Sequence, residues 1–370
     1  MSGWGRAALC LPPAPSQLSA DLLVVGLGGT GLAAVHEGLD LGLSVVGLDA
    51  RRVADGAAGK NGGFLLAGLS SFHHDAVERY GRAEAATWYR LSLSVRDDIV
   101  RRTPAAVRRV GSLRRALDEV EEADARELLE ALRADGFDAA WVDEPDGRGV
   151  LTPGDATFHP VARARALAWS ALRRGAQLFE RSPVTSVSEG LVHTASGVVR
   201  ARHVVVATDG ALQSFLPDAP ATAVRLQMLK TGPVAQGVVR RAVYARYGYD
   251  YWQQSADGCI YVGGGRHLNP AAEATHDETP SDEIQRHLDH VLRDLLHVEA
   301  PVSDRWASVV TYSQDGLPIA RRLGSSIAVL GAYNGTGNVI GAMLGRAAVR
   351  ALVERRTPPA LGLTGWPDGP

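Results

Sequence analysis

The apolar positions near the start of the chain alternate between short continuous runs and a stretch of helical spacing. Residues 22–25 form one apolar run and residues 44–48 form another, and short runs of this kind are typical of buried strands. Between the two runs, Leu32, Val35 and Leu39 recur at helical spacing. A strand, a helix and a second strand in this order predict a βαβ unit with parallel strands.

Similar patterns continue through the rest of the chain. Helical spacing predicts helices over residues 74–102, 112–134, 160–175, 280–298 and from 337 to about 354. Short apolar runs predict strands over residues 176–180, 184–188, 191–194, 198–200, 203–207 and 327–330. Residues 223–266 alternate as antiparallel strands, and a period of two would put Tyr247, Tyr249 and Tyr251 on one face, opposite Trp252. The pattern therefore predicts an α/β fold class with an α+β second domain.

Composition narrows the class of protein without identifying a function. The length of 370 residues suggests two domains or one large one, and the net charge of −2 gives no electrostatic case for nucleic acid. Two cysteines, Cys10 and Cys259, are too few for a disulfide framework, which fits a cytoplasmic location. Because no apolar run reaches the roughly 18 residues of a membrane span, we expect no integral membrane segment. Residues 1–20 make a poor signal peptide, and we expect flexible tails there and at 357–370.

A glycine motif joins the first predicted strand to the first predicted helix. Gly26, Gly28 and Gly31 have the G-x-G-x-x-G spacing, in which glycines permit a tight turn, close approach of a pyrophosphate and close helix–strand packing. The N-terminus of the helix would offer free N–H groups to phosphate. Asp49 ends the next strand and would accept hydrogen bonds from ribose hydroxyls, which disfavours NADP. The alternative is a glycine-rich turn that binds no dinucleotide.

Four segments together resemble a family of FAD-dependent amine oxidoreductases. They are the motif at 26–31 with Asp49, residues 56–63 (G-A-A-G-K-N-G-G), residues 204–210, and residues 315–318 followed by 331–337. The family includes D-amino-acid oxidase, glycine oxidase and sarcosine oxidase. Residues 56–63 resemble the G-A-S-G-R-N-G-G of its gamma-glutamylputrescine oxidase-like branch. The resemblance extends from about residue 20 to residue 355.

The resemblance implies a Rossmann-like FAD-binding domain assembled from residues 20–75, 150–215 and 315–356. Residues 76–149 and 216–314 would form a helical insert and a smaller antiparallel-sheet substrate domain, with the active site where the tyrosines face the flavin. FAD would be bound non-covalently, since no cysteine lies near the C-terminal motif. A helix N-terminus after residue 337 would stabilise the negative charge of the reduced flavin.

Individual roles follow from the same resemblance. The ADP half of FAD would contact the first glycine motif and Asp49, the adenine would contact the Val184 backbone, and residues 60–63 would lie along the isoalloxazine ring. Residues 335–337 would lie beside its O2 edge. The cofactor-binding residues implied are Gly26, Gly28, Gly29, Thr30, Gly31, Asp49, Ala50, Lys60, Asn61, Gly62, Gly63, Val184, Ala207, Thr208, Gly210, Gly331, Asn334, Gly335, Thr336 and Gly337. The candidate catalytic residues are Lys60, Tyr251, Tyr261 and Arg266.

Two departures from the family pattern fall in the predicted substrate domain, and a third lies in the predicted flavin loop. Val310 stands where amino-acid oxidases of this family carry the arginine that binds the substrate carboxylate, and Arg266 or Arg225 are candidate substitutes. Tyr261 stands where sarcosine oxidases carry a lysine that promotes the reaction with O2. Lys60 replaces the usual arginine of the branch and would support the flavin or activate O2, or else is simply a cation on a loop.

The implied reaction is hydride transfer from the carbon beside an amine or amino-acid nitrogen to flavin N5, giving an imine that hydrolyses. The electron acceptor would be O2 or another oxidant. The tyrosines would favour an amine cation by cation–π attraction, or would pack into the core. The alternatives are a non-catalytic FAD-binding scaffold with a diverged substrate domain and an NAD-dependent dehydrogenase. His287 and His290 share a helix face without a clear partner ligand, so no metal site is expected.

Overall fold

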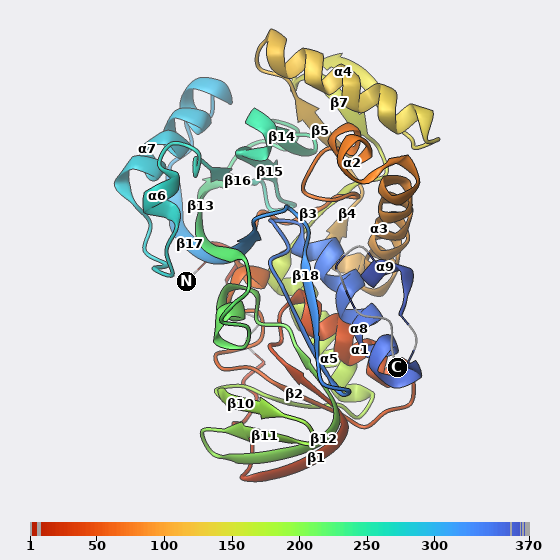
Figure 1. Ribbon diagram of the computed structural model, residues 1–370. Helices are drawn as coiled ribbons and strands as arrows, with labels where there is room; N and C mark the ends of the chain where they lie inside the picture. Colours follow the sequence, from red (N-terminus) through yellow and green to blue (C-terminus); the bar gives the residue numbers. More distant parts are fainter. Residues whose placement is uncertain (1, 6–8, 356, 363, 365, 367–370) are drawn as a thin grey trace. The chain divides into compact units, whose positions relative to one another are not determined.

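The computed structural model describes residues 2–5, 9–355, 357–362, 364 and 366 (Figure 1). The contacts between residues divide the chain into two compact units. Unit 1 consists of Met1–Gly5, Lys60–Pro160 and Val224–Val309, and unit 2 consists of Arg6–Gly59, Val161–Ala223 and Val310–Pro370. Both units are therefore assembled from separate chain segments. The functional domain limits given above stay a prediction.

Unit 2 contains an eight-stranded sheet. Its order is β10-β11-β12-β1-β2-β9, and β19 pairs with β12 while β18 pairs with β19. The strands are β1 (Gln17–Val25), β2 (Val45–Leu48), β9 (Gln177–Phe179), β10 (Val184–Ser188), β11 (Leu191–Thr194), β12 (Gly197–Val206), β18 (Ile319–Leu323) and β19 (Ile327–Gly331). The helices are α1 (Gly29–Asp40), α5 (Pro160–Arg173), α8 (Ala342–Glu354) and α9 (Pro359–Gly362), with short turns at Ala57–Gly59, Asp209–Ser214 and Gly337–Gly341.

The predicted parallel βαβ unit is present in this sheet. β1 pairs in parallel with β2 and β12, and β2 pairs in parallel with β9. Leu22, Leu23 and Val24 are completely buried, as expected for a parallel strand that is covered on both faces. The two strands predicted over 198–200 and 203–207 form one strand, β12, which pairs antiparallel with β11 at its start and parallel with β19 near its end.

Unit 1 contains a second, mostly antiparallel sheet of eight strands in the order β17-β13-β16-β15-β14-β5-β7-β6. Its strands are β5 (Ser112–Arg115), β6 (Ala140–Glu144), β7 (Gly147–Thr152), β13 (Ala221–Pro233), β14 (Ala242–Ala245), β15 (Asp250–Gln254), β16 (Cys259–Gly264) and β17 (Val302–Ser313). A three-stranded sheet contains β3 (Phe64–Leu65), β8 (Ala156–Phe158) and β4 (Val107–Arg108).

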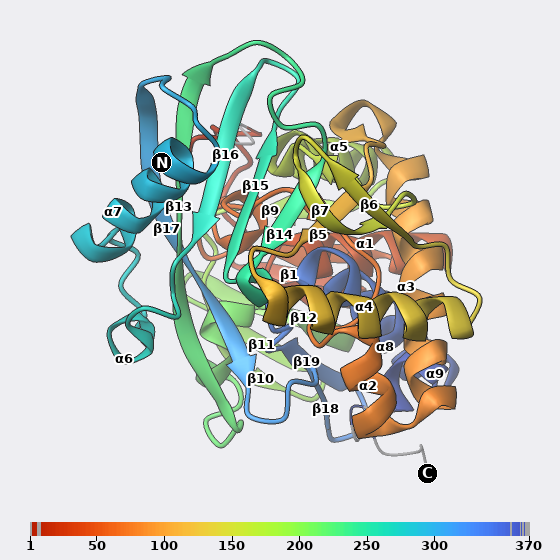
Figure 2. The ribbon, with the colours of Figure 1, turned by 90° about the horizontal axis from the view of Figure 1, so that it is seen from above.

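Unit 1 also contains helices. They are α2 (His73–Tyr80), α3 (Arg82–Arg102), α4 (Glu119–Ala134), α6 (Pro270–Glu273) and α7 (Asp282–His290), with short turns at Pro104–Ala106, Arg246–Gly248 and Val291–Leu295. Of these helices, α4 and α7 pack against its sheet. Ile284 and Leu288 of α7 pack with Trp252 of β15, and Leu128 of α4 packs with Val150 of β7. Figure 2 shows α7 at one end of this sheet and α4 at the other. The observed architecture confirms the α/β fold class with an α+β part.

Three predicted helices begin or end at other residues in the structure than the sequence predicts. Gly81 has a φ of +84° and separates α2 from α3, so the predicted helix over 74–102 is two helices. α4 begins only at Glu119, because Asp118 caps it by accepting a hydrogen bond from the Glu121 N–H, while residues 112–115 are strand β5. The predicted helix over 280–298 is α7, which begins at Asp282 after Ser281 at the N-cap position and is followed by a π turn at 291–295.

The prediction of three tyrosines on one strand face is wrong. Tyr247 lies in a turn with a φ of +57° and is 46% exposed, and Tyr249 follows that turn. Of the three tyrosines, only Tyr251 belongs to strand β15. Trp252 lies on the opposite face of this strand, as predicted, and is buried. Positive φ values interrupt a strand regardless of its side-chain alternation.

The predicted tails are partly structured. β1 begins at Gln17, and Trp4 is only 5% exposed, so residues 1–20 are not simply a flexible tail in the part that the structure describes. The other end includes α9, and residues 363, 365 and 367–370 of the predicted C-terminal tail lie outside the described residues.

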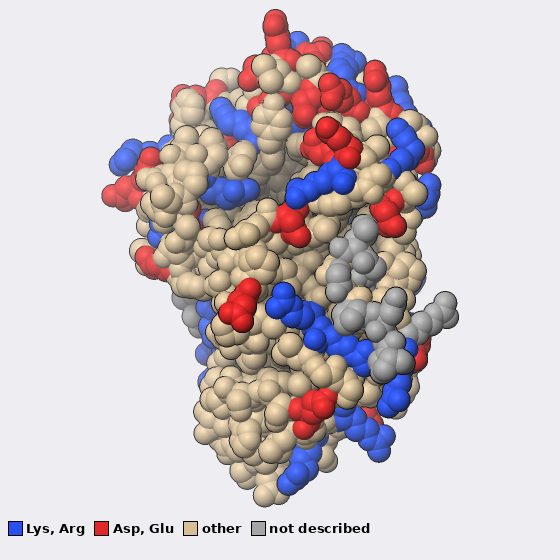
Figure 3. Space-filling view, viewed as in Figure 1, with Lys and Arg blue, Asp and Glu red and all other residues tan. Residues whose placement is uncertain are grey.

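The face in Figure 3 carries interspersed acidic and basic side chains.

Candidate functional site

In unit 2, the turn between β1 and α1 has a shape that requires glycine at two positions. Gly26 has a φ of +93°, and a Cβ there would lie 2.5 Å from the Ala207 carbonyl oxygen. A Cβ on Gly31 would lie 1.8 Å from the Gly26 carbonyl oxygen. Both distances are far below van der Waals contact. The turn can therefore form only with glycine at these positions, as the dinucleotide motif predicts.

The N-terminus of α1 is open to a ligand. Gly28 is its N-cap residue and makes no side-chain capping hydrogen bond. Among the described residues, a Cβ on Gly28 would meet only the Ala58 Cβ, at 3.3 Å. The backbone N–H groups of the first helical turn are thus not covered by a cap, and such groups bind phosphate. This cradle fits the pyrophosphate of a dinucleotide.

Thr30 has a packing role within this turn. A Cβ on Gly341 would lie 2.3 Å from the Thr30 hydroxyl oxygen, and one on Gly345 would lie 2.5 Å from the Thr30 carbonyl oxygen. The two glycines therefore allow α8 to approach α1 closely. The predicted cofactor contact of Thr30 would have to come from its backbone, since its side chain faces α8.

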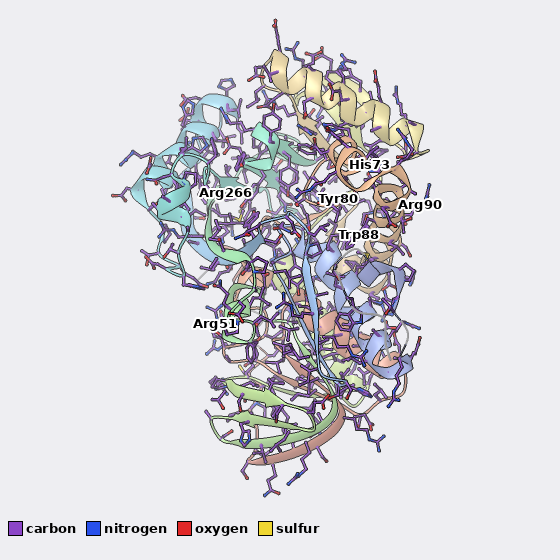
Figure 4. The ribbon with its side chains drawn as sticks, in the orientation of Figure 1. Arg51, His73, Tyr80, Trp88, Arg90 and Arg266 are labelled. Atoms are coloured by element: carbon purple, nitrogen blue, oxygen red, sulfur yellow. The ribbon has the colours of Figure 1, made fainter. Side chains whose placement is uncertain are left out.

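Asp49 ends β2 and organises the same turn. Its carboxylate accepts hydrogen bonds from the Leu27 N–H at 2.9 Å and from the Arg51 N–H at 2.8 Å. Arg51 is labelled in Figure 4. Burial raises the pKa of the Asp49 carboxyl, although these backbone hydrogen bonds oppose the shift. Ala50 beside it is exposed. A carboxylate oxygen accepts more than one hydrogen bond, so Asp49 retains capacity for a ribose hydroxyl.

The second glycine-rich turn of unit 2 connects β19 to α8 and is held in an unusual conformation. Ala332, Asn334 and Gly335 have φ values of +52°, +53° and +83°. The Asn334 side-chain oxygen accepts a hydrogen bond from the Ser313 N–H at 2.8 Å, which anchors the turn to β17. Strained backbone of this kind is frequent at ligand sites.

Asp209 also supports the second turn, and sequence reasoning missed it. Its carboxylate accepts a hydrogen bond from the Ala332 N–H at 3.0 Å. Its carbonyl oxygen accepts one from the Thr311 hydroxyl at 2.8 Å. Burial raises the pKa of the Asp209 carboxyl to about 7. The available signal was an acidic residue directly after a buried strand, in Thr208-Asp209-Gly210. The resemblance implied cofactor contacts for Thr208 and Gly210 but assigned no role to Asp209 between them.

The predicted flavin loop, residues 60–63, lies in unit 1 and is held by side chains from distant parts of the sequence. The Trp306 indole N–H donates to the Lys60 carbonyl oxygen at 2.8 Å, and the Trp4 indole N–H donates to the Asn61 carbonyl oxygen at 2.8 Å. The Gln253 amide donates to the Gly63 carbonyl oxygen at 2.9 Å. The loop therefore has a defined shape rather than the mobility that its glycines would otherwise allow.

Three of the four candidate catalytic residues lie around this loop. The Lys60 ammonium forms an ion pair with Glu278. The Tyr251 ring lies 3.1 Å from the position that a Cβ on Gly62 would take. Tyr261 is only 2% exposed, and burial raises the pKa of its phenol well above the usual range.

Trp4 covers Tyr261, a contact that sequence reasoning missed because residue 4 was assigned to a tail. The two rings stack with their centroids 3.5 Å apart and an angle of 6° between their planes. The Tyr261 hydroxyl donates to the Gly3 carbonyl oxygen at 3.4 Å. A tryptophan at the start of a chain carries no sequence signal for such packing.

The candidate carboxylate-binding arginines lie elsewhere in unit 1. Arg225 is buried and forms a bidentate ion pair with Glu273, with distances of 3.0 and 2.8 Å. Its guanidinium is therefore engaged within the fold. Arg266 lies over the Tyr249 ring, 4.5 Å from the ring centroid, on the α6–α7 side of unit 1 and away from His73 (Figure 4). Val310 is a partly buried residue of β17.

Two possible features are not found among the described residues. None of their helices is long and apolar enough to cross a membrane. They also contain no group of three or more His, Cys, Asp or Glu side chains that could hold a metal ion.

Comparison with known sequences finds a matching family and relatives. Residues 21–351 match the sequence model of a protein family described as FAD dependent oxidoreductase. The chain is 25% identical to the gamma-glutamylputrescine oxidoreductase of Escherichia coli (strain K12), over 90% of this chain and 84% of that protein.

Two crystal structures are similar in fold. The L-proline dehydrogenase from P. horikoshii has a TM-score of 0.76 and 18% identity, covering 95% of this chain and all of the other (100%). The glycine oxidase from Geobacillus kaustophilus has a TM-score of 0.75 and 20% identity, covering 94% of this chain and 98% of the other.

Proposed function

Since this chain belongs to the family of FAD dependent oxidoreductases, we propose that it oxidises the carbon–nitrogen bond of a primary or secondary amine or an amino acid. The cofactor of the family is FAD. The observation that carries the proposal is the family match over residues 21–351. It is supported by relatives whose names specify gamma-glutamylputrescine, glycine and L-proline, which all contain such a bond.

The proposed reaction balances as a two-electron oxidation. FAD supplies the acceptor, flavin N5, for the hydride that leaves the carbon beside nitrogen. The substrate nitrogen loses a proton, and a carbon–nitrogen double bond forms. Water then adds to this imine, giving a carbonyl compound and ammonia or an amine. O2 or another oxidant finally takes the two electrons.

The residues of the chain bind and orient the reactants in this proposal. In unit 2, Gly28 and the N-terminus of α1 would receive the pyrophosphate, and Asp49 would accept a hydrogen bond from the ribose. The open α1 N-terminus supports these assignments. In unit 1, the loop held by Trp4, Trp306 and Gln253 would lie along the isoalloxazine ring. A loop fixed in this way would orient the ring without rearrangement.

Within this class, an amine without a carboxylate on the reacting carbon fits best. The buried Arg225 is engaged by Glu273, and Val310 has no charge with which to bind a carboxylate. Both observations remove a carboxylate-binding arginine. Arg266 is then the arginine proposed to bind the carboxylate of any amino acid that reacts.

A substrate panel tests the proposal. The purified protein loaded with FAD is incubated with polyamine derivatives, simple amines, glycine, L-proline and D-amino acids, in air and with an artificial electron acceptor. We expect a carbonyl product and a released amine or ammonia from at least one amine. If no compound in the panel is consumed with either acceptor, the alternative of a non-catalytic FAD-binding scaffold replaces the proposal.

A further inference from the structure

The loop at residues 60–63 of unit 1 has all its carbonyl groups hydrogen-bonded, while one of its N–H groups has no acceptor in the described structure. We infer that the Gly62 N–H donates a hydrogen bond to the flavin ring of FAD, and that Trp4 is the positioning residue that orients it. The inference rests on the proposed function, since it takes FAD as the cofactor and places this loop along the ring. It concerns the flavin and does not depend on which substrate is oxidised.

The carbonyl groups of the loop are the first argument. Each carbonyl of residues 60–63 accepts a hydrogen bond from a side chain of unit 1, and the donors are the indole N–H groups of Trp306 and Trp4 and the amide of Gln253. A trans peptide bond places its C=O and N–H on opposite sides, and the described backbone contains no cis peptide bond. An N–H that shares a peptide group with one of these carbonyls therefore points away from the side chain that holds it.

The Gly62 N–H is the second argument. It shares a peptide group with the Asn61 carbonyl, so it points away from the Trp4 indole. The next N–H along the loop, that of Gly63, donates to the Asn61 side-chain oxygen at 2.8 Å. Among the residues that the structure describes, none accepts a hydrogen bond from the Gly62 N–H. Backbone donors in folded proteins find a partner, and a ligand supplies one here.

The rigidity of Trp4 is the third argument. Its ring is 5% exposed and stacks on Tyr261 with the centroids 3.5 Å apart. The preceding Gly3 is also fixed, because its carbonyl accepts a hydrogen bond from the Lys230 ammonium at 3.2 Å. A Cβ on Gly3 would lie 2.7 Å from a carbon of the Trp306 ring, so a side chain does not fit there. The indole N–H of Trp4 therefore has a fixed direction, and so has the peptide group that it holds.

The expected consequence concerns the reduction of the flavin. A hydrogen-bond donor stabilises a charged acceptor more than a neutral one, and reduction adds negative charge to the ring. The hydrogen bond from Trp4 also polarises the peptide group and makes the Gly62 N–H a stronger donor. Through this peptide, Trp4 favours binding of reduced FAD over oxidised FAD and thereby raises the midpoint potential.

Redox titration of the FAD-loaded protein tests the inference without any substrate. Trp4→Phe keeps a ring that can stack on Tyr261 but removes the N–H donor. We expect this variant to bind reduced FAD about tenfold more weakly relative to oxidised FAD, as loss of a hydrogen bond to a charged group does. For a two-electron couple, this change lowers the midpoint potential by about 30 mV. Equilibration with a reference dye of known potential measures it.

Trp88→Phe is the matched control. Trp88 lies on α3 (Figure 4), is 1% exposed, and its indole N–H has no acceptor among the described residues. This change therefore removes a buried indole without removing a hydrogen bond, and its midpoint potential should equal that of the wild type. If Trp4 only stabilised the fold, both variants would melt at a lower temperature with an unchanged potential. That result overturns the inference.

Amide hydrogen exchange of the wild type provides a second test, which also serves if Trp4→Phe does not fold. Exchange at Gly62 is compared between the FAD-loaded protein and the protein stripped of FAD. We expect at least about tenfold slower exchange with FAD bound, because a hydrogen-bonded N–H exchanges only after local opening. Equal rates in the two forms would overturn the inference. Neither measurement needs a substrate, so an absence of turnover would count against the proposed function alone.

Discussion

At the scale of single residues, Gly28 and Gly31 of the first turn differ in what an added Cβ would contact. A Cβ at Gly31 would collide with backbone at 1.8 Å, whereas a Cβ at Gly28 would meet only the Ala58 methyl group at 3.3 Å. Gly31 is therefore required by the fold itself. Gly28 is required only when a ligand approaches the backbone.

This difference predicts opposite phenotypes for two alanine variants. Gly28→Ala should change the melting temperature of the FAD-free protein by no more than about 2 °C, because its φ of −81° suits any residue. It should weaken FAD binding about tenfold or more. Gly31→Ala should lower the melting temperature of the FAD-free protein markedly, through overpacking against backbone. Thermal melts with a flavin titration measure both, and unimpaired FAD binding by Gly28→Ala would contradict the assignment.

The raised pKa of the Asp209 carboxyl predicts that the stability of the protein depends on pH. Burial raises its pKa from 3.8 to about 7, so the folded protein holds the proton more tightly than the unfolded chain. The stability contributed by this proton is fully present below pH 3.8 and is lost as the pH rises through about 7. Asp209→Asn keeps an oxygen that accepts from the Ala332 N–H but does not titrate.

The measurement compares melting temperatures of the two proteins between about pH 5 and pH 8. The wild type should lose more stability than Asp209→Asn over this range. Parallel pH profiles for the two proteins would show that the Asp209 carboxyl does not titrate there.

At the scale of elements, the N-terminal segment is part of unit 1. Trp4 is buried against Tyr261 and holds the Asn61 carbonyl. We expect Trp4→Ala to cost about 3–5 kcal/mol, as large-to-small changes of buried aromatic residues do. Trp169→Ala is a suitable control because Trp169 is 46% exposed. Urea unfolding measures both, and equal effects of the two changes would contradict the packing role of Trp4.

Substitution of Arg225 and of Arg266 should affect different properties of the protein. Arg225→Met should destabilise the protein by about 3–5 kcal/mol, because it leaves the Glu273 carboxylate buried without its partner. Arg266→Met should raise the KM of any amino-acid substrate without raising that of amines, and should destabilise the protein less than Arg225→Met, because Arg266 stacks on Tyr249 rather than pairing with a buried carboxylate. Urea unfolding and steady-state kinetics separate the two, and an equal rise in KM for amines would exclude a carboxylate-binding role.

The helices and strands differ in how well the sequence alone predicts them. The buried strand at 22–25, the glycine turn and the start of α5 at Pro160 were predictable, because each depends on residues close in sequence. The break at Gly81 and the strand at 112–115 were not, since helical spacing alone does not reveal a positive φ or a pairing partner. Trp4 and Asp209 support their loops through contacts across long separations in the chain, which one sequence does not record.

At the scale of the whole molecule, the residues proposed to contact FAD come from separate segments of the chain. The first turn would supply positive potential to the pyrophosphate. The second turn, held by Asp209 and Asn334, would contact the flavin. The departures at Val310 and Tyr261, by contrast, lie within residues 216–314, which are predicted to belong to the substrate domain. The substrate class is therefore the property that most needs a direct measurement.

That measurement is anaerobic reduction of the bound flavin. The FAD-loaded protein is mixed with one amine without oxygen, and its visible flavin absorbance is followed together with the carbonyl product. The account predicts bleaching with one carbonyl formed per flavin reduced, fastest with amines that lack a carboxylate on the reacting carbon. A flavin that stays oxidised with every amine and amino acid, or bleaches without carbonyl product, would contradict carbon–nitrogen bond oxidation.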